Sequence, residues 1–118
     1  MNNVDIKKEL IEAKEYLKLS IIDIAQITGL NISGIINILN NNEAELNNLT
    51  DNGKKILIEI LKLSNLYKKV FKDDTELIDI YLRGGNAYFG KYSSLEFMKL
   101  KPGENIFEVV AAHTRMLT

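Results

Sequence analysis

A single proline, Pro102, in a chain of 118 residues is the feature that most constrains the fold. Proline removes a backbone donor and clashes with the preceding helical turn, so its scarcity leaves almost every segment free to form helix. Strand-like alternation of apolar and polar residues nowhere extends beyond a few positions. Apolar residues instead recur every three or four positions, which predicts an all-α fold in a single compact domain. Hydrophobic residues make up 46% of the chain, enough to fill one core.

The pattern predicts seven helical segments. The first covers residues 3–19. The second begins at Ser20, where Ser20 and Asp23 approximate a capping box, and Gly29 ends it as a left-handed C-cap. The third follows Asn31, a good N-cap.

A polar, asparagine-rich connection, NNNEAELNNL, then leads to a long helix opened by Thr50 and Asp51. An apolar stripe on this helix predicts the spine of the core: Ile56, Ile60, Leu63, Tyr67 and Val70, with Leu57, Leu61 and Phe71 beside it. Three shorter helices follow, with caps and breaks at Asp73 or Asp74, Gly84 and Gly85, Ser93 or Ser94, Lys101-Pro102-Gly103, and Asn105. We divide the chain into an N-terminal unit, residues 1–48, and a long helix plus C-terminal part, residues 49–118.

Residues 20–40 have the spacing of a helix-turn-helix. Ala25 is small where two helices cross, and Gly29 allows the turn. Ile35 and Ile38 would lock the second helix onto the first. In such a unit the second helix enters the major groove of DNA. The exposed positions that would face the bases are Asn31, Ser33, Gly34, Asn37 and Asn40.

The charge of this unit argues against strong DNA binding. No Lys or Arg occurs between Lys18 and Lys54, and residues 1–70 hold nine lysines and nine acidic residues. Phosphate contacts, which supply most DNA affinity, usually come from Lys and Arg. The unit could equally serve as a scaffold or a dimerisation module.

The residue inventory gives no support for an enzyme or for a cofactor. Cysteine is absent, which excludes thiol catalysis and thiolate metal sites, and His113 is the one histidine. Ser93 and Ser94 have no base nearby in sequence, and the acidic residues at 73, 74 and 76 suit helix capping. We therefore expect no catalytic, cofactor or metal site. No apolar run could cross a membrane and the first residues lack a signal-peptide pattern, so we expect a cytoplasmic protein.

The most informative stretch, residues 81–110, reads YLRGGNAYFGKYSSLEFMKLKPGENIFEVV. It resembles the C-terminal toxin-binding domain of the Xre/MbcA/ParS antitoxin family. The family pattern is Trp-Leu, two residues, Pro-Asn, two residues, Leu-Gly-Gly, one residue, Ser-Pro, one residue, Glu-Leu-Leu, followed by a Gly and a final helix. Its spacing is kept over residues 81–98, through Tyr81-Leu82, Gly85-Asn86, Phe89-Gly90, Ser93, Glu96 and Phe97-Met98, and Gly103 precedes the last helix.

Four positions depart from the family pattern. Tyr81 stands where the family has Trp, Gly85 and Ser94 stand for its two prolines, and Lys91 replaces the second Gly.

The resemblance implies the antitoxin of a type II toxin–antitoxin system. Members bind a partner toxin, commonly of the RES class that consumes NAD, and obstruct its NAD pocket. Their N-terminal unit often mediates dimerisation and repression of the operon, so a homodimer, or a hetero-oligomer with the toxin, is expected, with operator DNA as a weaker partner. By analogy, the toxin contacts would come from the loop at 83–92 and the tail at 110–118, through Arg83, Asn86, Tyr88, Gly90, Lys91, Tyr92, His113 and Arg115.

Two other classes stay open at this stage. A small helix-turn-helix transcriptional regulator would use the N-terminal unit, although basic residues are missing around the second helix of its helix-turn-helix. A phage or mobile-element protein that inhibits another host protein would be a binding blocker with the same sequence properties as an antitoxin. The genes beside this one would separate such an inhibitor from an antitoxin.

Overall fold

The computed structural model describes residues 2–40, 43–100 and 106–117. Within these ranges the chain forms seven α-helices and two short 3₁₀ helices, and no strand, so the predicted all-α fold is confirmed. The elements are α1 (Asn3–Leu17), α2 (Ile21–Thr28), α3 (Ile32–Asn40), η1 (Glu43–Asn48), α4 (Asp51–Phe71), α5 (Thr75–Arg83), η2 (Ala87–Phe89), α6 (Ser94–Leu100) and α7 (Ile106–Arg115).

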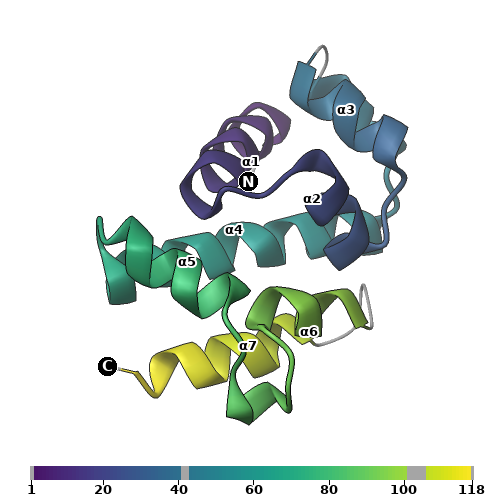
Figure 1. The fold of residues 1–118 in the computed structure, drawn as a ribbon. Coiled ribbons are helices and arrows are strands. Elements are labelled where there is room, and N and C mark those ends of the chain that lie inside the picture. The colour runs from purple at the N-terminus through teal and green to yellow at the C-terminus, as the bar shows by residue number, and fades with distance from the viewer. Residues whose placement is uncertain (1, 41–42, 101–105, 118) are drawn as a thin grey trace.

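The long helix α4 runs through the middle of the molecule (Figure 1). Helices α1, α2 and α3 lie on one side of it, and α6 and α7 lie on the other. The predicted spine is buried on α4 except for Val70, which is partly exposed. Helix α2 also packs against α6, and α1 against α5. One core of buried side chains therefore joins the two parts of the chain that the sequence divides.

The helix ends follow the predicted local chemistry. Ser20 and Asp23 form the capping box of α2, and Gly29 ends that helix at φ 74°. Thr50 accepts from the Gly53 amide at the start of α4, and Asp74, not Asp73, caps α5. Each cap satisfies backbone groups that the helix itself leaves without partners.

Two features depart from the sequence reading. Helix α1 ends at Leu17, two residues early, because Lys18 takes a left-handed conformation with φ 54°. The polar connection contains the 3₁₀ helix η1, on which Leu46 is completely buried. One leucine among asparagines has no periodicity, so sequence pattern alone could not place it in the core.

The break predicted at Lys101-Pro102-Gly103 and the cap at Asn105 lie outside the described residues, as does Thr118. Among the helices that are described, none has the length and apolar character needed to cross a bilayer.

Candidate functional site

Four rings gather where α5, η2 and α7 meet. His113 of α7 stacks on Tyr88 of η2, with ring centroids 4.2 Å apart, and on Tyr81 of α5 at 5.6 Å. Phe89 meets the imidazole edge-on at 5.1 Å. Since Tyr81 and Phe89 are buried, they fix the inner side of the imidazole against the core.

A run of polar contacts extends from His113 into the protein. Nδ1 of His113 lies 2.7 Å from the Tyr81 hydroxyl, which lies 3.0 Å from the Thr114 hydroxyl. Thr114 Oγ1 in turn lies 2.8 Å from the carbonyl oxygen of Val110 on the preceding turn of α7. Burial raises the pKa of the Tyr81 phenol, against a smaller lowering by Thr114. Tyr81 is therefore a neutral hydroxyl across the physiological pH range.

The loop between α5 and α6 holds Tyr88 in position. The side chain of Asn86 accepts a hydrogen bond from the Tyr88 amide at 2.9 Å and so caps η2. The Asn86 amide donates to the Tyr92 carbonyl, which closes the loop on itself. Gly90 ends η2 at φ 75°, a left-handed conformation that glycine adopts without strain.

Large exposed apolar groups occur at Tyr88 in η2 and just after α7, the helix that carries His113. Tyr88 is 51% exposed, and Met116 and Leu117, just beyond the last turn of α7, are 70% and 49% exposed. We call Tyr88, His113, Met116 and Leu117 the aromatic surface. Aromatic residues and methionine are enriched in protein interfaces, and an exposed ring already held by its neighbours loses little freedom on binding.

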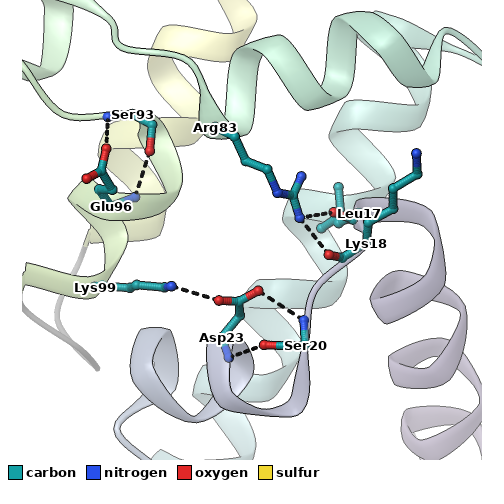
Figure 2. Close-up of polar contacts among 8 residues, drawn as sticks. All are labelled: Leu17, Lys18, Ser20, Asp23, Arg83, Ser93, Glu96 and Lys99. Atoms are coloured by element: carbon teal, nitrogen blue, oxygen red, sulfur yellow. Dashed lines mark hydrogen bonds and ion pairs between the residues drawn. The ribbon is translucent and has the colours of Figure 1, made fainter.

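Arg83, a predicted partner contact, points toward α1 (Figure 2). Its guanidinium donates to the carbonyl oxygens of Leu17 and Lys18 at 3.1 and 2.6 Å and also pairs with Asp79. These carbonyls end α1, where a cation complements the helix dipole. Arg83 therefore joins α5 to the end of α1.

The remaining predicted contacts separate in space. Lys91 and Gly90 are exposed on the loop, and Tyr92 is half-buried beneath it. Arg115 lines a small cavity between α4 and α7 together with Glu59, Phe107 and Glu108. It thus lies on the α4 side of α7, away from the imidazole of His113. Of the eight predicted residues, Tyr88 and His113 are the pair in direct ring contact.

The predicted DNA-reading residues lie on the outer side of α3. Asn31, Ser33, Asn37 and Asn40 are all exposed. Asn31 Oδ1 accepts from both the amide and the hydroxyl of Ser33, at 2.9 and 2.6 Å, and so caps α3. Two of the four side chains are therefore already hydrogen-bonded to each other.

An ion pair joins α2 to α6 (Figure 2). Lys99 Nζ lies 2.7 Å from Asp23, the residue that completes the capping box of α2. Partial burial acts to raise the pKa of Asp23, but the hydrogen bonds from Lys99 and Ser20 together outweigh it and lower the pKa. Glu96 forms the equivalent box with Ser93 at the start of α6, and those hydrogen bonds lower its pKa.

Sequence reasoning missed Tyr81 and Thr114 as parts of the site. The sequence indicated Tyr81 only as the position of a family Trp, and Thr114 only as part of the tail at 110–118. Their hydroxyls meet because the fold brings the side chains of α5 and α7 together at this point. No local signal in the sequence shows such a contact between residues 33 positions apart.

No protein-family model matches the chain, and neither curated proteins nor solved structures give a significant match. The family resemblance therefore stays a prediction that depends on spaced residues alone. The described ranges hold no cluster of three or more potential metal-ligating His, Cys, Asp or Glu side chains.

Proposed function

We propose that this chain is an antitoxin that binds a partner toxin through the aromatic surface and blocks its active site. The observation that carries the proposal is Tyr88, half exposed yet held at 4.2 Å on the ring of His113. A large ring that is both accessible and fixed is the kind of residue that dominates protein-binding energies. Steric occlusion of an active site needs such an anchor and no chemistry of its own.

The partner class comes from the family resemblance. The spacing over residues 81–98 resembles antitoxins whose toxins are commonly of the RES class and consume NAD, so a toxin of this class is the proposed partner. A contact by Tyr88 and His113 is supported by their ring stacking, and Lys91 is exposed on the same loop as Tyr88. Arg83 and Asn86 would act indirectly, since the first joins α5 to α1 and the second caps η2.

A second candidate function is operator binding through α3, which would make the chain a regulator of its own genes. One contact favours it. A Cβ at Gly53 would lie 3.4 Å from the Leu30 side chain, so the first turn of α4 packs against the turn between α2 and α3. Lys54 and Lys55, which follow Gly53, therefore lie near the turn before α3 and could supply phosphate contacts that α2 and α3 lack.

Co-expression with the adjacent open reading frame tests the proposal. We expect the neighbour to be toxic alone, to be neutralised by this chain, and to co-elute with it on a column. A harmless neighbour that forms no complex would refute the antitoxin assignment. In that case DNA binding at low salt becomes the next assay, because electrostatic contacts are strongest there.

A further inference from the structure

The contacts around His113 determine where its imidazole proton resides. Three contacts run in series: His113 Nδ1 to Tyr81, Tyr81 to Thr114, and Thr114 to the Val110 carbonyl. Each hydroxyl has one proton to donate, and a carbonyl oxygen can only accept. The direction of all three hydrogen bonds can therefore be worked out from the last one.

Thr114 must donate to Val110, since two oxygens 2.8 Å apart without a proton between them would repel. The Thr114 oxygen then accepts from Tyr81, which uses the only proton of that phenol. Tyr81 must in turn accept from His113, so Nδ1 has to carry a proton. If Nδ1 carried no proton, the two hydroxyls would have two protons for three contacts, so either the Thr114–Val110 or the Tyr81–Thr114 contact would lack a hydrogen.

The other ring nitrogen, Nε2, reaches solvent. Within the described part of the chain it makes no hydrogen bond, and the buried polar side-chain atoms that lack a partner there are Ser64 Oγ and Tyr67 Oη. Nε2 is therefore an accessible atom. In a neutral imidazole with its proton on Nδ1, this atom is a hydrogen-bond acceptor.

We propose that the buried contacts hold His113 as the Nδ1–H tautomer and thereby present Nε2 to the partner as a hydrogen-bond acceptor. The matching group on the partner is an N–H or O–H donor, placed beside the exposed ring of Tyr88. This inference rests on the proposed function for the existence of a partner, but the tautomer is a property of the chain alone.

The tautomer can be measured directly because His113 is the only histidine. In a long-range proton–nitrogen NMR spectrum of the labelled full chain at about pH 8, above the usual titration range of histidine, we expect Nδ1 to be protonated and Nε2 unprotonated. Thr114→Val should remove this preference and shift the nitrogens toward the reverse tautomer. Tyr81→Phe is the second variant should Thr114→Val not fold. Tyr92→Phe, which removes a hydroxyl outside these contacts, should leave the spectrum unchanged.

Two substitutions of His113 distinguish the roles of the two ring nitrogens in partner binding. His113→Asn keeps a donor near the Nδ1 position and has nothing at Nε2, whereas His113→Gln places an amide near Nε2. Against the co-purified toxin, His113→Asn should weaken affinity about ten-fold, roughly the effect of one hydrogen bond. His113→Gln should lose less, because its amide can still bond to the donor on the partner.

Two results would overturn the inference: a proton on Nε2 in the wild-type chain at pH 8, or equal affinities for His113→Asn and wild type. The absence of any toxin complex would instead refute the proposed function. The spectrum of the chain alone would still decide the tautomer in that case.

Discussion

The outer side of α3 and the aromatic surface both face solvent, but their side chains differ in chemistry. On α3 the exposed side chains are short, polar and uncharged, and Asn31 and Ser33 are bonded to each other. On the aromatic surface the exposed groups are the Tyr88 ring and the apolar chains of Met116 and Leu117, and the half-buried imidazole of His113 stacks on Tyr88. The outer side of α3 therefore resembles an ordinary solvated helix face. The aromatic surface exposes apolar side-chain area to water, which is unfavourable.

The difference suggests where the chain binds. Protein interfaces derive most of their energy from a few large, fixed side chains, and the aromatic surface has one in Tyr88. DNA affinity comes mainly from cations, and no Lys or Arg occurs between Lys18 and Lys54, the stretch that contains α3. A protein partner at the aromatic surface is therefore the stronger expectation, and α3 is secondary.

The core shared by the two regions gives the largest predicted effect. Leu57 on α4 is fully buried within the cluster that includes residues from both parts of the chain. Leu57→Ala should lower the free energy of unfolding by about 3 kcal/mol, through lost burial and a residual cavity. Urea denaturation followed by circular dichroism and by tyrosine fluorescence should give coincident single transitions. Two separate transitions would show that the regions fold independently.

Arg83 should stabilise the contact between α5 and the end of α1 rather than the complex with the partner. Arg83→Ala removes the hydrogen bonds to Leu17 and Lys18 and should cost about 1 kcal/mol of unfolding free energy, because the guanidinium is partly exposed. Arg83→Lys retains the charge but cannot span both carbonyls in the same way. It should recover about half of the loss. Thermal denaturation of the three proteins measures both values.

The ion pair between Asp23 and Lys99, which joins α2 to α6, predicts that the free energy of unfolding depends on pH. The pKa of Asp23 is lowered in the folded chain, so its contribution to stability is present above the unfolded value of about 3.9 and is lost as pH falls through the folded value. Asp23→Asn should lower stability by roughly 0.5–1 kcal/mol at neutral pH. The difference from wild type should shrink between about pH 4 and 2. Glu12→Gln, which makes the same change of charge on α1, is the control.

The smallest effect is expected on α3. Replacing Asn37 and Asn40 by Ala should change the free energy of unfolding by less than about 0.5 kcal/mol, because both side chains are exposed. The double variant should also bind a protein partner as wild type does. A loss of partner binding on this change would move the interface from the aromatic surface to α3.

Helices and their ends could be predicted from the sequence because they depend on local chemistry. Ser20, Gly29 and Thr50 each act within four residues of their own position. Leu46 and Thr114 could not be placed, since burial of the first and the hydrogen bonds of the second depend on how distant helices cross. For the site, the sequence indicated Tyr88 and His113 separately, and the fold brought them into contact.

We propose that the partner binds at the aromatic surface. The most direct test of this proposal is the affinity of the neighbouring toxin for Tyr88→Ala and for the α3 double variant, measured against wild type by calorimetry. We predict that Tyr88→Ala weakens binding by at least about 2 kcal/mol, near 30-fold, with the fold retained and the α3 variant unaffected. Wild-type affinity in folded Tyr88→Ala, or a loss confined to the α3 variant, would contradict the account.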